Sequence, residues 1–172
     1  INSETSHFFD GNNDGTPNVV FSTTDPGGFN TSGPGTDQLF VQEPGLEGTT
    51  GLTPDLRVDF LQGAVGSVGF GFATTSQMTG VFQTFNSIHQ QIASQVFASE
   101  FFDLDTGEPT GEPGGPGGDE PGGPGGGLTS GFPEGRVDLP FDGVAAYATI
   151  DFNGSFEGDR YIIDNFTYTS DG

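Results

Sequence analysis

Apolar and polar residues alternate along much of this chain with a period of two, which is the pattern of a half-buried β-strand. In the run 56–60, for example, Leu56, Val58 and Phe60 fall on one face. Similar strand-like runs occupy 18–24, 38–42, 68–72, 144–152 and 160–169. Turns rich in Gly, Pro and Asp separate the runs. Many short strands joined by such turns predict an all-β fold, an antiparallel β-sandwich or jelly roll.

One segment has a different period. Phe85, Ile88, Ile92 and Val96 recur near the helical spacing of three to four residues, and an Asn and a Ser that can cap a helix follow Phe85 directly. This pattern predicts one short helix over residues 86–94. The sequence after it returns to a strand-like pattern.

A low-complexity segment lies between the strand-like regions. Residues 107–127 contain only Gly, Pro, acidic residues and one Thr. Such a segment has no side chains to bury, so it predicts a disordered, flexible loop. Strand-like sequence continues on both sides, and too few residues follow for an independent fold. We therefore expect a single domain, residues 1–172, with this loop as an insertion.

The charge balance is strongly acidic. The chain has 24 Asp and Glu residues, only three basic residues, all Arg, and a formal net charge of −21 at pH 7. Such a surface repels phosphate backbones, so we expect no nucleic-acid partner, and it attracts divalent cations. No apolar run reaches the roughly 18 residues that a membrane span needs. Cys is absent, which excludes disulfides and thiolate metal sites, and 18 Phe residues are the expected core.

An alternating acidic segment is the first candidate for chemistry. Asp10, Asn12 and Asp14 are spaced as in the first half of an EF-hand loop, and the backbone carbonyl of Thr16 stands at the seventh position. Ca²⁺ prefers six to eight such oxygen ligands. Phe21 occupies the twelfth position, where an EF-hand has Glu, so the segment is not an EF-hand. It predicts a calcium site completed by other residues; the alternative is a plain Asn/Asp-rich turn.

Asp164 is the second candidate. Strand alternation places it on one face with Ile162, Phe166 and Tyr168. A carboxylate among apolar neighbours is costly unless a partner compensates its charge. Ca²⁺ can supply that compensation, as can one of the three Arg residues, and partial exposure of the face is the third possibility.

Three segments carry a resemblance to known families: "FFDG" (8–11), "LRVDFLQGAVGSVGFGF" (56–72) and "YIIDNFTYT" (161–169). Together they resemble secreted bacterial β-sandwich proteins of the PEP-CTERM kind, which typically end in an "IDNF" strand. The last segment is also similar to the closing strand of calcium-containing carbohydrate-binding jelly rolls. These resemblances imply an extracellular or cell-surface location. They also imply a structural Ca²⁺ held by Asp164 with Glu4 or Asp10 near the N-terminus.

The composition offers little for catalysis. There are two His, no Lys and no Cys, and neither His lies in a recognisable motif, so we expect no enzymatic activity. The favoured function is an extracellular calcium-binding structural or adhesive protein. It would self-associate into a surface layer or filament by strand complementation. The alternative is a calcium-stabilised carbohydrate-binding module whose partner is a polysaccharide.

Overall fold

The computed structural model describes residues 2–10, 13–42, 44–110, 129–154 and 156–172, and all regular structure in them is β-strand. The strands are β1 (Asn2–Glu4), β2 (Ser6–Phe9), β3 (Val19–Ser22), β4 (Phe29–Ser32), β5 (Gly45–Thr49), β6 (Leu56–Thr74), β7 (Thr79–Phe85), β8 (Gln91–Ala98), β9 (Glu134–Pro140), β10 (Ala145–Phe152) and β11 (Arg160–Ser170). Their pairings are all antiparallel, which confirms the predicted all-β class. The described elements include no helix with the length and hydrophobicity to span a membrane.

Strand β6 organises the sheet because its two halves have different partners. Residues 56–60 pair with β3 on one side and β10 on the other, whereas residues 64–74 pair mainly with β9 and β11. The sheet therefore divides at β6 into two branches. The first branch contains β2, β3, β10, β7 and β8, and the second contains β1, β4, β5, β11 and β9.

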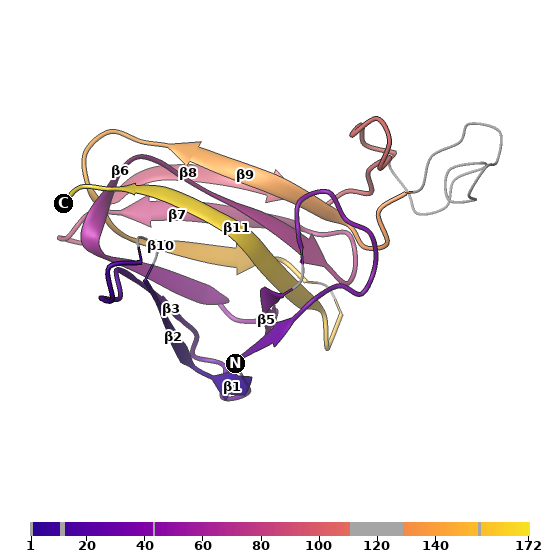
Figure 1. Ribbon diagram of the computed structural model, residues 1–172, viewed down its shortest axis with the longest axis horizontal. Helices are drawn as coiled ribbons and strands as arrows, with labels where there is room; N and C mark the ends of the chain where they lie inside the picture. Colours follow the sequence, from indigo (N-terminus) through magenta and orange to yellow (C-terminus); the bar gives the residue numbers. More distant parts are fainter. Residues whose placement is uncertain (1, 11–12, 43, 111–128, 155) are drawn as a thin grey trace.

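The division follows from a strong bend in β6, visible in Figure 1 between its two halves. Gly63 and Gly66 lie there with φ values of +75° and +80°, a backbone region that glycine adopts far more easily than other residues. The register with β10 also shifts across the bend, because Ala145 lies opposite Ala64 and Tyr147 opposite Asp59. The bend lets one strand belong to both branches.

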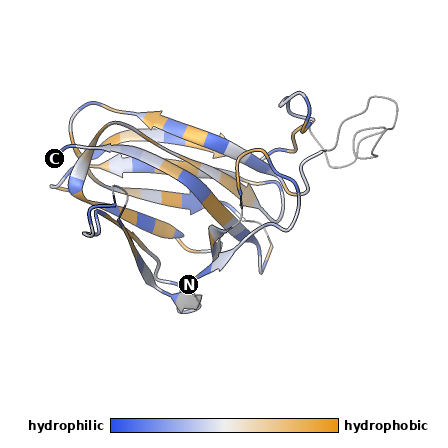
Figure 2. Cartoon of the chain, in the orientation of Figure 1, coloured by the Kyte–Doolittle hydropathy of each residue, from blue (hydrophilic) through white to orange (hydrophobic). Residues whose placement is uncertain are grey.

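The core forms between the apolar faces of the two branches. Phe70 of β6, in the second branch, packs edge to face on Phe82 of β7, in the first, with ring centroids 4.9 Å apart. Phe72 lies 4.8 Å from Phe97 of β8. Figure 2 shows the hydrophobic and hydrophilic residues alternating along β9, as half-buried strands require. The expected Phe-rich core is confirmed.

A turn between β7 and β8 replaces the helix predicted for 86–94, so that prediction is wrong. The Asn86 side chain accepts the backbone N–H groups of Ile88 (3.1 Å) and Gln90 (2.9 Å). His89 adopts a left-handed φ of +65°. The helical spacing was misleading because Ile88 and Val96 are each 68% exposed and do not form a buried stripe.

The predicted Gly/Pro-rich loop falls mostly outside the described residues. Its first four residues, 107–110, are described and take part in backbone hydrogen bonds, and the flexibility of the loop stays a prediction. The Thr110 N–H donates to the Phe101 carbonyl at 2.7 Å, and the Asp103 N–H donates to the Glu108 carbonyl at 2.9 Å.

Candidate functional site

A groove of about 510 Å³ lies between the β2–β3 hairpin and strands β5 and β11, where the two branches separate. Phe9, Phe21, Phe166 and Tyr168 give it an aromatic lining, and Asp164 is among its few polar residues. Grooves of this volume with such a lining commonly bind small molecules or extended segments. We therefore take the groove as the candidate functional site.

The rings that line the groove are packed on one another. Phe21 lies edge to face between Phe9, with centroids 5.3 Å apart, and Phe166, at 5.0 Å. Phe166 and Tyr168 both contact Phe60 of the core, at 6.2 and 5.1 Å. Phe9 is 38% exposed, and the His7 ring packs edge to face against it at 4.5 Å. The groove wall thus continues directly from the core to β2.

A β-bulge in β11 brings Phe166 to the groove. Asp164 lies opposite Gly71 and Thr167 opposite Gly69, so β11 has one more residue than β6 over this interval. Asn165 absorbs the extra residue with a left-handed φ of +51°. The bulge reverses the alternation, so the prediction of one shared face for 162, 164, 166 and 168 is wrong.

Asp164 and Ile162 lie on the outer face of β11, away from the core. Ile162 packs with Val41 and Ala73 in a small outer cluster. The Asp164 carboxylate accepts the backbone N–H of Gln42 at 2.8 Å. This hydrogen bond supplies part of the compensation that the sequence requires for a carboxylate at this position.

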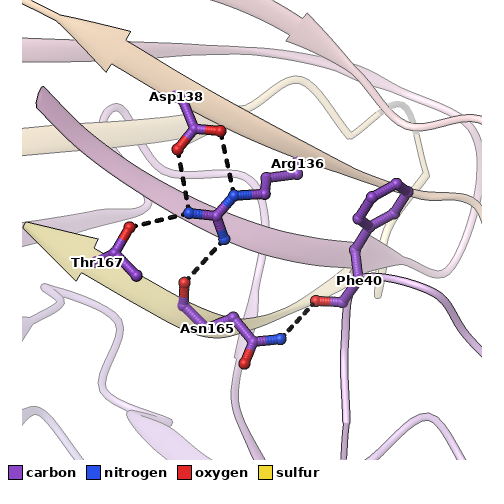
Figure 3. A network of polar contacts seen from close by, with 5 residues as sticks. All are labelled: Phe40, Arg136, Asp138, Asn165 and Thr167. Atoms are coloured by element: carbon purple, nitrogen blue, oxygen red, sulfur yellow. Dashed lines mark hydrogen bonds and ion pairs between the residues drawn. The ribbon is translucent and has the colours of Figure 1, made fainter.

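Arg136 anchors β9 to the bulge, as Figure 3 shows. Its guanidinium donates to both carboxylate oxygens of Asp138 (3.0 and 3.1 Å), to the Asn165 carbonyl (2.9 Å) and to the Thr167 hydroxyl (2.9 Å). The Asn165 amide in turn donates to the Phe40 carbonyl at 3.1 Å. The network fixes the backbone on either side of Phe166 and therefore the shape of the groove.

No Arg pairs with Asp164, although the sequence left that possibility open. Arg57 pairs with Asp59 (2.7 Å), Arg136 pairs with Asp138 (3.0 Å), and Arg160 pairs with Glu47. These three Arg are all the Lys and Arg of the chain. Its large excess of carboxylates therefore has no basic side chain left to pair with.

Hydrogen bonds join Asp10 to residues 14 and 15, and Asp14 to Thr16. The Asp10 carboxylate accepts the backbone N–H groups of Asp14 (3.2 Å) and Gly15 (2.6 Å), and the Asp14 carboxylate accepts that of Thr16 (2.8 Å). Asn12 lies outside the described residues. Glu4, the other N-terminal candidate, contacts the His7 ring at 2.9 Å.

The predicted calcium ligands do not form one carboxylate cluster. Across the described residues there is no group of three or more His, Cys, Asp or Glu side chains placed to hold a metal, so Asp10, Asp14 and Asp164 do not converge in this way. Each carboxylate oxygen that accepts an N–H has a second lone pair, and backbone carbonyls are also calcium ligands. Calcium binding by the segment 10–16 stays a prediction.

Calcium added to chelated protein is expected to raise the free energy of unfolding by about 2.7 kcal/mol when free Ca²⁺ reaches about a hundred times its Kd. Asp14→Asn keeps an acceptor for the Thr16 N–H but removes the charge, so it should reduce the gain. Asp142→Asn, at an exposed turn, is the matched control and should not. Thermal melts with Ca²⁺ and with EDTA measure the effect. An equal gain in wild type and Asp14→Asn would contradict the site.

Sequence reasoning missed a buried carboxylate, Glu134, beside the groove's supporting loop. Glu134 is fully buried and accepts the backbone N–H groups of Leu39 (2.8 Å) and Phe40 (2.7 Å) together with the Ser130 hydroxyl. It thereby ties the segment before β5 to the start of β9. Nothing in the sequence around Glu134 distinguishes it from the exposed acids.

Asp55 is the second buried carboxylate. Its oxygens accept the backbone N–H groups of Leu52 (2.9 Å) and Phe152 (2.7 Å), joining the start of β6 to the end of β10. Burial, reinforced by the charge of Asp151, raises the pKa of Asp55 from 3.8 to about 6, although the two N–H groups act in the opposite direction. Its position after "TP" is a turn signal that could have indicated a structural role.

Comparison with known proteins does not add a family. No family model matches this chain, and the search of curated proteins finds no significant match.

Proposed function

We propose that this chain is an extracellular, calcium-binding structural or adhesive protein that assembles with copies of itself by strand complementation. In this proposal the two branches of the sheet are the faces of a β-sandwich, and the aromatic groove between them receives an extended strand. The observation that carries the proposal is the way β1 and β2 bridge the two branches next to the groove.

The N-terminal strands pair with an edge of each branch. In the second branch, β1 pairs with β4, placing Asn2 opposite Asn30. In the first branch, β2 pairs with β3, placing Ser6 opposite Ser22. A neighbour's copy of residues 2–9 presents the same groups to the same edges, so exchange between molecules preserves every backbone hydrogen bond.

The anchoring of β2 is suited to exchange. Only Phe9 reaches the aromatic wall, where it contacts Phe21, while Phe8 is 58% exposed. Releasing so short a strand exposes little apolar surface, and a neighbour's Phe9 can refill the same place. Bound divalent cations would reduce the repulsion between copies that each carry a net charge of −21.

A reversible disulfide between residues 6 and 22 tests strand exchange. The Thr23 N–H donates to the Thr5 carbonyl, which makes Ser6 and Ser22 the neighbouring non-hydrogen-bonded pair, with Cα atoms about 4.5 Å apart, a spacing that a disulfide accepts. Because the chain has no Cys, Ser6→Cys/Ser22→Cys contains the only thiols.

In calcium, wild type and the reduced double variant are expected to grow into large assemblies, whereas the oxidised variant stays a small, discrete species. Light scattering and electron microscopy measure the difference, and the same samples in EDTA test the calcium requirement. Equal growth of the oxidised and reduced forms would overturn strand exchange.

The groove also supports the second candidate, a carbohydrate-binding module. Its volume suits one or two sugar rings, and Thr31 and Tyr168 offer polar groups beside aromatic surface. The oxidised double variant, which cannot exchange strands, provides the test. Saturable, specific binding of this form on a glycan array would favour the module over the assembling protein.

A further inference from the structure

One long segment of this chain contains no acidic residue, Lys or Arg. Residues 60–99 contain no Asp, Glu, Lys or Arg, so all 24 acidic residues lie outside them. The second half of β6 explains part of this, since a central strand is buried on both faces. It does not explain β8, in which Gln91, Ser94, Gln95 and Val96 are exposed. Strand β8 thus presents an exposed surface without charged side chains.

Strand β8 is also an edge. Among the described strands it pairs with β7 alone. The Thr79 carbonyl accepts a bond from Asn153 on the β10 side, so by alternation Gly80, Phe82 and Thr84 bond to β8. The backbone N–H and carbonyl groups of their partners Phe97, Gln95 and Ala93 therefore point toward β7. The backbone groups of Ser94, Val96 and Ala98 accordingly face away from β7. Beside Ala98 they meet β9, where a Cβ on Gly135 would lie 3.3 Å from the Ala98 carbonyl oxygen, so the open part of the edge is 94–96.

The strand bonds of Glu100 show where β9 meets this edge. Glu100 lies in phase with Ser94, Val96 and Ala98, and it exchanges backbone hydrogen bonds with Glu134 at 2.9 and 2.8 Å. Among the described residues this bridge is not continued along β8. On the edge itself the Gln95 amide donates to the Val96 carbonyl of the same strand at 3.0 Å. An incoming strand can replace that bond.

Natural edge strands are usually protected by charge, proline or a bulge that discourages pairing. The exposed stretch 94–96 of β8 has none of these, and Val96, 68% exposed, lies beside Val81 on the outer face. Elsewhere two copies of a chain with a net charge of −21 would bring carboxylates together. The β7–β8 hairpin is a surface on which copies can meet without doing so.

We propose that β8 is a homotypic docking edge, at which two copies of this chain pair antiparallel through residues 94–96 across a two-fold axis. Such a pairing is self-complementary, because each copy offers the same outward N–H and carbonyl groups. It joins the first branches of both copies into one continuous sheet. This deepens the proposed assembly by naming a second contact, one that needs neither the N-terminal strands nor calcium.

Single-cysteine variants test the pairing directly. Because the wild-type chain has no Cys, any disulfide in such a variant joins two molecules. Ser94→Cys, Gln95→Cys and Val96→Cys cover the registers in which one residue lies on the axis opposite its own copy. Ser67→Cys, exposed in the charge-free part of β6, is the matched control. At least one β8 variant is expected to cross-link about tenfold faster than the control, since opposed Cα atoms in a strand pair fall within disulfide range.

A charge variant gives the independent measurement. Ser94→Glu places two like charges at the pairing edge and is expected to weaken dimerisation by about tenfold or more, whereas Ser67→Glu leaves it unchanged. Sedimentation velocity in EDTA over a range of protein concentrations measures the dimer, and circular dichroism confirms that each variant is folded. No cross-linking above the control, or equal dimerisation of Ser94→Glu and wild type, would overturn the proposal.

The oxidised Ser6→Cys/Ser22→Cys protein separates the two contacts. If β8 pairing holds and strand exchange fails, the locked and unlocked proteins are both dimers. If strand exchange holds and β8 pairing fails, the unlocked protein assembles in calcium and the locked protein is a monomer.

Discussion

Replacing Glu134 with Ala is expected to lower the free energy of unfolding by about 4 kcal/mol. The substitution removes the acceptor for the backbone N–H groups of Leu39 and Phe40 and for the Ser130 hydroxyl. Each buried donor left without an acceptor costs about 1–3 kcal/mol. The loss should also release the segment that carries Phe40 against the bulge in β11.

Two further variants isolate the cause. Glu134→Gln keeps an oxygen for the two N–H groups, and its amide can donate to Ser130, so we expect a loss of only about 1 kcal/mol. Glu157→Ala removes an exposed acid and should change stability by less than about 0.5 kcal/mol. Urea denaturation followed by circular dichroism measures all three. A Glu134→Ala variant as stable as Glu157→Ala would show that the carboxylate does not hold the loop.

Asp55 is expected to make the protein less stable as the pH rises from 4 to 7. Its pKa is about 6 in the folded state and close to 3.8 when unfolding restores it to water. Between these values the folded chain binds more protons than the unfolded chain, so the free energy of unfolding falls with rising pH. The difference in pKa corresponds to a fall of about 3 kcal/mol, nearly complete above pH 6.

Asp55→Asn isolates this effect from the other carboxylates. The Asn side chain does not titrate, so the stability advantage of wild type over the variant should shrink by about 2 kcal/mol between pH 4 and pH 7. The absolute stability of Asp55→Asn does not enter the comparison, because only the change with pH is measured. Parallel stability profiles of the two proteins would mean that Asp55 is already charged at low pH.

Short-range patterns predicted the strands well. The alternation at 56–60 and 148–152 survives in β6 and β10 because each of these stretches has one face on the core and a regular register. At the start of β10 the register shift places Ala145 in the core and leaves Val144 42% exposed, against the alternation expected for 144–152. The structure also explains why positions 69 and 71 are glycines. A Cβ at Gly71 would lie 2.0 Å from the Phe40 carbonyl oxygen, and one at Gly69 would lie 2.0 Å from the Asp138 carboxylate. Both leave room for the outer layer that holds the bulge.

Predictions based on periodicity were wrong at two places, in the turn before β8 and at the bulge in β11. The helical spacing between Phe85 and Val96 arises from a turn closed by Asn86, which adds residues between two strands without adding buried positions. In β11 the bulge at Asn165 moves Phe166 to the core side while Asp164 stays outside. A single inserted residue reverses every later position in a strand, and no local pattern marks it.

The candidate site was accessible to sequence reasoning only in pieces. Asp10, Asp14 and Asp164 attracted attention as oxygen ligands, and the structure uses their carboxylates as acceptors for backbone N–H groups. The groove was not predicted. Its rings come from β2, β3 and β11, and only the pairing of those strands determines that they meet.

The amino-acid sequence was enough to establish four properties of this protein. The chain is acidic, Phe dominates its core, its strands are antiparallel, and one long stretch carries no charge. These properties follow from the residue types and from the alternation of apolar and polar side chains along each strand. The tertiary structure alone decided which acids are buried, where β6 bends, on which face Asp164 lies and which strand is left as an edge. Those outcomes depend on contacts between residues far apart in the chain, and their energies have no counterpart in a local pattern.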